Sequence, residues 1–144
     1  MIGLDFKAVQ NTFFDRKAVM DATDKATRKV LSKFGAFVMT GARRSIRKSK
    51  RPSSPGQPPR SHVGTLRRGI LFGYDSAGRT VVIGPVLAEH ATGAPETLEY
   101  GGRAEVTSHK KAIVVEIAAR PYMHPAMAAE LPKLPKMWAD SIKP

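Results

Sequence analysis

The chain has 144 residues and no cysteine, which suits a single domain with a modest core and excludes disulfides, thiolate metal sites and a cysteine nucleophile. Its 24 Lys and Arg against 12 Asp and Glu give a net charge of +12, which predicts attraction to nucleic acid, an anionic membrane surface or an acidic protein. No apolar run reaches about eighteen residues and no basic segment precedes an apolar one at the N-terminus, so we expect neither a membrane-spanning helix nor a secretory signal.

The stretch from residue 15 to 48 predicts one long amphipathic helix. Asp15 is the expected N-cap, and at about 1.5 Å per residue the helix is roughly 50 Å long. Gly35 and Gly41 each cost about 1 kcal/mol relative to alanine, so they indicate kinks or close packing. The apolar residues recur in steps of three or four, which keeps them on one face: Val19, Ala22, Ala26, Val30, Phe34, Phe37, Val38, Ala42 and Ile46.

Residues 49–62 are expected to form an exposed, extended loop, because four prolines exclude a regular helix and leave few backbone donors for a sheet. The surrounding segment is basic: nine Lys and Arg and no carboxylate stand between Arg43 and Arg68. One hypothesis is phosphate contact through the nucleic-acid backbone, since the segment has no aromatic residue to stack on bases. The other is a solvated arm, or a surface that pairs with an acidic neighbouring subunit. Under the first hypothesis the phosphate contacts are Arg43, Arg44, Arg47, Arg67 and Arg68.

An antiparallel hairpin is predicted after the loop, with strands near 69–75 and 79–84. Apolar residues alternate along both segments, as expected for strands with one buried face. Ser76-Ala77-Gly78 forms the link, in which the glycine is available for a positive φ.

The next segments add a helical turn and two more strands. Residues 95–100 are expected to form one turn of helix that Gly101-Gly102 ends. A third strand is expected at 103–108. Residues 112–119 are rich in β-branched residues and predict a central strand of the same sheet. Residues 1–14 are apolar enough to cover the start of the long helix, as either a short helix or a strand.

Two short helices are predicted at the C-terminal end, at 126–131, where Pro132 stops the first, and at 136–142, which Pro135 opens. The expected fold class is therefore α+β. A long N-terminal amphipathic helix packs on a three- to four-stranded antiparallel sheet, with short C-terminal helices, in a single domain of residues 1–144.

The sequence contains no pattern that indicates an enzyme or a cofactor site. The four histidines are scattered without a metal-ligand spacing, and the glycine-rich stretches lack the nucleotide-binding patterns. No motif assembles a nucleophile, a base and an oxyanion hole. Glu99 is expected either at a helix C-terminus or in an inter-subunit salt bridge. We therefore expect no catalytic residue, metal or cofactor.

Several motifs in order resemble a known family. They are SSPGQPPR at 53–60, GTLRRGI at 64–70, LEYGG at 98–102 and ARPYMHPAM at 119–127. The series resembles the neck or tail-completion proteins of long-tailed bacteriophages, also called minor tail or head–tail joining proteins. Gly69 stands where the family has a small polar residue, and His124 stands where a basic residue is common.

The resemblance implies a non-enzymatic virion protein that forms a ring between the head connector and the tail tube. The implied partners are copies of the chain in a cyclic hexamer or dodecamer, the head connector, adaptor or portal-side proteins, the tail terminator or tail tube proteins, and packaged DNA without sequence specificity. No membrane is implied, and assembly would occur in the host cytoplasm.

The arm from residue 48 to 62 is expected to reach an adjacent subunit or the connector, and deletion of 51–60 is expected to leave the core folded. The expected contacts to a neighbouring subunit or the connector are Lys48, Lys50, Arg51, Pro55, Pro58, Pro59, Arg60, Glu99, Tyr100, Arg120 and Tyr122.

Two other functions stay open on the sequence. A cellular nucleic-acid-binding module that contacts the phosphate backbone would carry the same positive charge. A hydrolase built on a carboxylate pair, such as Glu99 and Glu116, is the third hypothesis.

Overall fold

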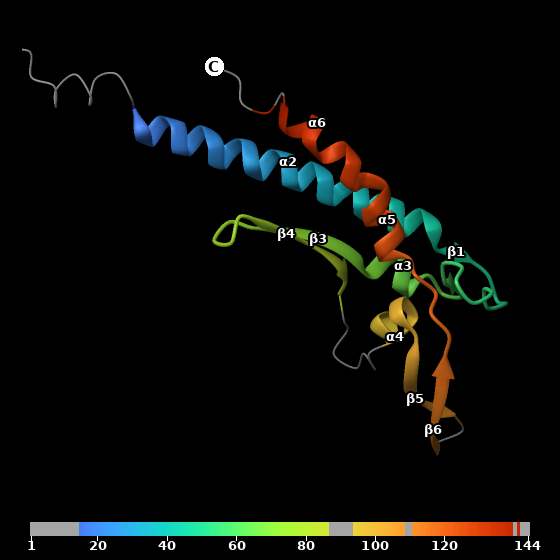
Figure 1. Ribbon diagram of the computed structural model, residues 1–144. Helices are drawn as coiled ribbons and strands as arrows, with labels where there is room; N and C mark the ends of the chain where they lie inside the picture. Colours follow the sequence, from blue (N-terminus) through green and yellow to red (C-terminus); the bar gives the residue numbers. More distant parts are fainter. Residues whose placement is uncertain (1–14, 87–93, 109–110, 140, 142–144) are drawn as a thin grey trace, which may run out of the picture.

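The computed structural model describes residues 15–86, 94–108, 111–139 and 141, and Figure 1 shows their arrangement. A long helix, α2 (Arg16–Ser45), forms the spine of the molecule. An antiparallel hairpin lies on one side of it, and the C-terminal helices lie along another. The predicted α+β fold class is confirmed. The predicted structure of residues 1–14 lies outside the described residues.

Helix α2 has 30 residues and begins as predicted. The Asp15 side chain accepts a hydrogen bond from the Ala18 N–H at 3.0 Å and so caps the first turn. The helix ends at Ser45, before the predicted residue 48, because Ile46 adopts an extended conformation. Residues 15–23 are exposed, so the first turns extend beyond the elements that cover the rest of the helix. The buried residues follow the predicted stripe and add one glycine: Ala26, Val30, Phe34, Gly35, Val38 and Ala42.

The first hairpin consists of β3 (Ile70–Asp75) and β4 (Thr80–Pro85), close to the predicted bounds. It packs on α2, where Gly35 lies against the side chains of two hairpin residues, Phe72 and Val81. The turn differs from the prediction in one respect. Arg79, not Gly78, adopts the positive φ. The Asp75 carboxylate accepts hydrogen bonds from the N–H groups of Ala77 and Gly78.

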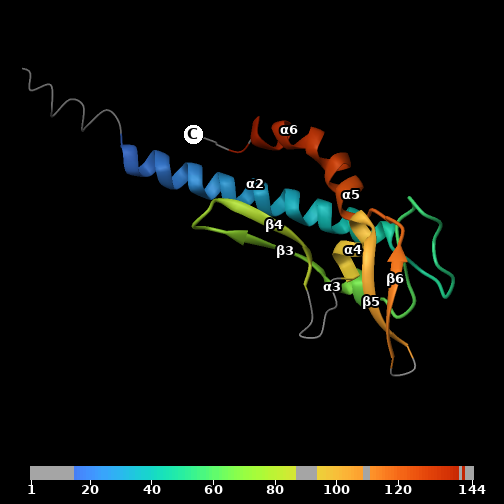
Figure 2. The same ribbon diagram turned by 60° about the horizontal axis from the view of Figure 1, so that its bottom comes forward.

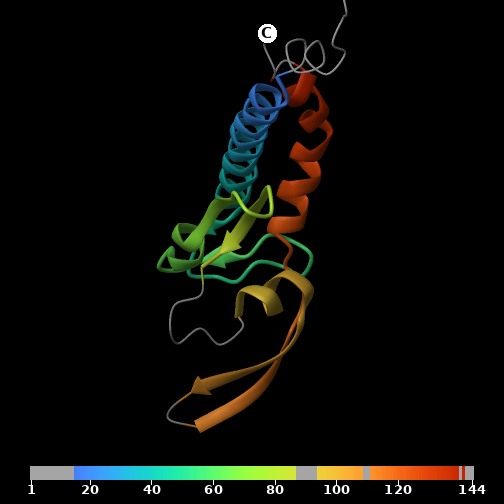
Figure 3. The same ribbon diagram turned by 90° about the vertical axis from the view of Figure 1, so that its left-hand side faces the viewer.

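The second hairpin consists of β5 (Gly102–Ser108) and β6 (Lys111–Ile117). These strands pair only with each other, so the described residues form three separate two-stranded sheets. The prediction of one three- to four-stranded sheet with 112–119 at its centre is therefore wrong. A β-branched run indicates a strand but not its partners, and here Ile113, Val114 and Val115 are exposed. Figure 3 shows the hairpin projecting away from α2.

A short helix, α4 (Ala94–Tyr100), precedes β5 and ends where predicted. Gly101 and Gly102 both have positive φ, which lets the chain turn sharply at the predicted end of the helix. A Cβ at Gly101 would lie 3.0 Å from the Ala119 nitrogen, so the chain also passes very close to the segment that leaves β6.

The C-terminal elements are α5 (Met123–Glu130), the 3₁₀ turn η1 (Leu131–Lys133) and α6 (Leu134–Ala139). They run beside α2, as Figure 2 shows. Helix α5 begins before the predicted residue 126, because its first turn has a cap that the sequence does not reveal. Helix α5 ends at Glu130, within one residue of the predicted end before Pro132, and Pro132 lies in the first turn of η1, where a proline is tolerated.

Three small elements were not predicted. Strands β1 (Arg47–Lys48) and β2 (Arg60–Ser61) pair in parallel at the two ends of the proline-rich loop. Helix α3 (Thr65–Gly69) is a short turn that leads directly into β3.

The best-buried cluster lies at the C-terminal end of α2. Its fully buried members are Ala42, Ile46, Ile70 and Tyr122. Partly buried residues from α2, α3, α4 and α5 pack around them: Met39, Leu66, Leu98, Met123 and Ala126. The core is therefore densest where the sequence motifs converge.

Candidate functional site

Glu99, in the LEYGG motif, caps helix α5. Its carboxylate accepts hydrogen bonds from three consecutive backbone N–H groups, at 2.9 Å from Tyr122, 3.0 Å from Met123 and 2.8 Å from His124. The next residue, Pro125, has no N–H, so every free donor at the start of α5 is satisfied by one side chain. Glu99 is only 8% exposed. Its role lies inside the subunit.

Arg120, in the segment between β6 and α5, connects the start of α5 to the proline-rich loop. Its Nε donates to the Ser53 carbonyl at 3.1 Å, and its backbone N–H donates to the Leu98 carbonyl at 2.6 Å. The Gly56 N–H donates to the Ala119 carbonyl at 2.8 Å. Three of the four motifs in the sequence are therefore joined by hydrogen bonds.

These bonds correct two expectations about contacts. Glu99, Arg120 and Tyr122 were predicted to contact a neighbour, but their polar groups or side chains are used within the chain. The loop is also not a free arm, because Pro59 and Ser53 are buried in the subunit. Deletion of 51–60 would remove both buried residues and the bond from Arg120 to Ser53, and the folding of the core without the loop stays a prediction.

The Tyr122 hydroxyl makes the free energy of unfolding depend on pH. Burial, and second the nearby Glu99 carboxylate, raise the pKa of Tyr122 from 10.0 to about 12. The folded state therefore holds this proton where the unfolded state has lost it. The contribution is complete below pH 10 and is lost as pH rises to 12. We expect the free energy of unfolding to fall by about 2 kcal/mol more across that range in the wild type than in Tyr122→Phe, measured by urea denaturation. Equal falls would contradict this assignment.

Arg43 holds α2 to the first hairpin. Its Nε donates to the Ile70 carbonyl at 3.0 Å, and its Nη2 donates to the Arg68 carbonyl at 3.3 Å. The carbonyl of Ile70 belongs to a fully buried residue. This use within the subunit differs from the predicted contact to DNA or phosphate.

The other four predicted phosphate contacts lie at one end of the molecule, here called the charged end, where α2 meets the proline-rich loop. A cavity of about 360 Å³ lies between the end of α2 and the proline-rich loop, lined by Arg44, Ser45, Arg47, Ser53, Ser54, Gln57, Pro58 and Arg60. A neighbouring hollow of about 250 Å³ is lined by Ile46, Lys48, Ser61, Val63, Gly64, Arg67 and Arg68. Four predicted phosphate contacts thus divide between two adjacent hollows.

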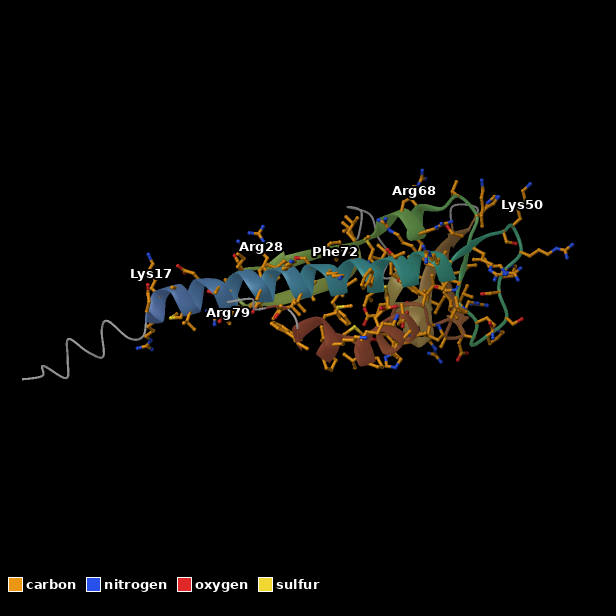
Figure 4. The ribbon with its side chains drawn as sticks, turned by 90° about the horizontal axis from the view of Figure 1, so that it is seen from above. Lys17, Arg28, Lys50, Arg68, Phe72 and Arg79 are labelled. Atoms are coloured by element: carbon orange, nitrogen blue, oxygen red, sulfur yellow. The ribbon has the colours of Figure 1, made fainter. Side chains whose placement is uncertain are left out.

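The tip of the loop is exposed. Lys50, Arg51 and Pro55 are accessible, whereas Pro58 is half-buried. Figure 4 shows Lys50 and Arg68 pointing away from the body, with Lys50 at the end of the molecule opposite Lys17. These positions are free to meet a neighbour, as is Tyr100, which is 77% exposed.

A second basic groove was not predicted. It lies between α2 and α6, has a volume of about 530 Å³, and is lined by Lys29, Val30, Lys33, Lys133, Lys136, Met137 and Ser141. Lys133 forms an ion pair with Glu130. The sequence does indicate the α2 side of this groove, since Lys29 and Lys33 lie one helical turn apart beside the apolar stripe.

Exposed apolar residues occupy both hairpins. Val114 in β6 is 71% exposed, and its neighbours on either side are also accessible. On the first hairpin, Leu71 and Val82 face away from α2 and are exposed. Neither surface is covered by another described element.

Comparison with known proteins does not assign the chain to a family. No family model, curated protein or solved structure matches it. Among the described residues, no three His, Asp or Glu side chains gather as ligands for a metal. None of the described helices has the length and hydropathy to cross a membrane.

Proposed function

We propose that the chain is a structural subunit of the ring at the head–tail junction of a long-tailed bacteriophage. The ring would join the head connector to the tail tube around the DNA channel, as a cyclic hexamer or dodecamer. The proposal assigns no catalytic activity and places the protein in the virion. It is supported by the ordered motifs, and by a fold that leaves apolar and basic surfaces uncovered in the single chain.

The β5–β6 hairpin is the observation that carries the proposal. An isolated two-stranded hairpin is marginally stable in water, and this one exposes three successive apolar residues, Ile113 to Val115. Among the described residues no further strand pairs with either outer edge, so both edges can accept one. A neighbouring copy that covers the hairpin would bury the apolar residues and complete the sheet. The same contact repeated around an axis produces a closed ring.

The charged end supports the second part of the proposal. Basic residues gather around the end of α2 and the loop, while the opposite end of the molecule holds the exposed first turns of α2. A subunit with its basic end toward the channel would stabilise DNA without reading its sequence. The exposed loop tip, with Lys50 and Arg51, would then meet the connector or the next subunit.

A substitution on the hairpin tests the proposal. Val114→Lys changes an exposed residue, so the isolated subunit should fold with an unchanged melting temperature. In phage complementation, a lysine at a covered interface should prevent head–tail joining and leave tailless heads and free tails, counted by electron microscopy. Val19→Lys is the matched control, since Val19 is 48% exposed and lies in the first turns of α2, away from both the hairpin and the charged end. Normal virions from Val114→Lys would contradict the proposed contact.

A nucleic-acid-binding module is the second candidate, favoured by the cavity with three arginines. Duplex DNA affinity as a function of salt separates the two functions. A dedicated DNA-binding protein should bind below about 1 µM at physiological salt. A ring subunit that meets DNA only through its charge should bind weakly, with an affinity that falls steeply as salt rises.

A further inference from the structure

Three arginines line the cavity at the end of α2, and the backbone structure brings them close together. Arg47 and Arg60 are directly paired in the parallel β1–β2 ladder, which places them side by side. Arg44 is in the last turn of α2 and lines the same cavity. Their proximity is thus imposed by a strand pairing and a helix end.

No acidic side chain in the described part of the chain offsets this arrangement. Segment 43–68 contains no carboxylate, and no acidic residue lines the cavity. Among the described residues, none of the three arginines forms a salt bridge. Like charges that face each other across a strand pair are destabilising, so the subunit alone holds an uncompensated cluster.

Ser53 provides a second, independent observation. Ser53 lines the cavity and is only 6% exposed, and its buried Oγ has no hydrogen-bond partner among the described residues. The carbonyl of the same residue is fixed by Arg120 Nε, which holds Ser53 in place. Buried hydroxyl groups are normally hydrogen-bonded, so an orphaned one beside three arginines indicates a missing acceptor.

We propose that this cavity binds a phosphate group. Arginine guanidinium groups match phosphate oxygens with paired hydrogen bonds, and the Ser53 hydroxyl supplies a further donor from the wall. Ser54 and Gln57 add polar atoms to the lining. A tetrahedral phosphate can accept from all these directions, whereas a planar carboxylate has only two oxygens. The phosphate belongs either to a nucleic-acid backbone or to free inorganic phosphate, and the site does not depend on the proposed ring.

Titration of the full chain with inorganic phosphate at constant ionic strength tests the site, using calorimetry and backbone amide NMR. We expect saturable binding with shifts near Ser53. Ser53→Ala should weaken it at least about tenfold, and Arg47→Gln/Arg60→Gln should abolish it. Neither change removes a side-chain hydrogen bond or ion pair seen among the described residues, so both proteins should fold. Lys48→Gln/Arg67→Gln loses the same charge from the neighbouring hollow and should bind phosphate within about twofold of wild type.

A second experiment, titration with duplex DNA, then identifies the source of the phosphate. If DNA affinity falls much more in Arg47→Gln/Arg60→Gln than in Lys48→Gln/Arg67→Gln, and phosphate competes with DNA, the ligand is the nucleic-acid backbone. If both double variants lose DNA affinity equally while only the first loses phosphate, the ligand is free phosphate. Equal phosphate binding by all variants would overturn the proposal, and so would equal competition by glutamate, which would indicate an acidic protein instead.

Discussion

Glu99→Ala is expected to lower the free energy of unfolding by about 3 to 5 kcal/mol. The substitution leaves three backbone N–H groups at the start of α5 without an acceptor, and that of Tyr122 is buried. Each hydrogen bond to a charged acceptor contributes roughly 1.5 to 3 kcal/mol, and the three share one carboxylate, so the total is less than their sum. The loss of a negative charge from the helix N-terminus adds to the effect.

Urea denaturation followed by circular dichroism measures the change. Glu96→Ala is the matched control, since Glu96 lies in the same short helix but is exposed. We expect the control to lose less than about 1 kcal/mol. A loss of unfolding free energy in Glu99→Ala as small as that of the control would show that the Glu99 cap on α5 does not stabilise the fold.

Gly35→Leu is expected to destabilise the fold by about 3 kcal/mol, although leucine is the better helix former. A Cβ at this position would lie 2.8 Å from Val81 Cγ2 and 3.0 Å from a ring carbon of Phe72. Both side chains belong to the hairpin that covers α2, so even the first added carbon pushes the hairpin away. A larger side chain would separate the two elements and expose the apolar face between them.

Gly41→Ala is the comparison for this prediction. The added Cβ would meet only Ala126 Cβ at 3.5 Å, which is an ordinary van der Waals contact. Helix propensity then decides, and we expect a gain of about 1 kcal/mol. Thermal melts of the two variants should therefore shift in opposite directions. A rise in melting temperature for Gly35→Leu would show that the hairpin is not held closely against α2.

Local signals in the sequence predicted the local structure well. Asp15 caps the long helix, the apolar stripe from Ala26 to Ile46 is buried except for Phe37, and the first hairpin lies within a residue of its predicted bounds. Each of these features depends on residues a few positions apart, which periodicity and capping rules describe. Gly35 was also singled out by its cost in a helix, and close packing explains it.

Long-range structure could not be predicted in the same way. The Glu99 cap joins residues far apart in the chain, and an isolated glutamate before two glycines does not indicate its partner. The β-branched run in β6 correctly predicted a strand but not that it would stay at the surface, because strand propensity does not specify which strands pair. The position of Ser53 at the cavity depends on the loop folding back onto the end of α2, which the sequence does not indicate.

The measurement that most directly tests the proposed function is quantitative mass spectrometry of purified phage particles, scaled to the major capsid protein. We expect a copy number on the order of six to twelve per particle, as a closed ring requires. Absence from the particles would contradict the head–tail junction role, and a nucleic-acid-binding function would then become the leading account.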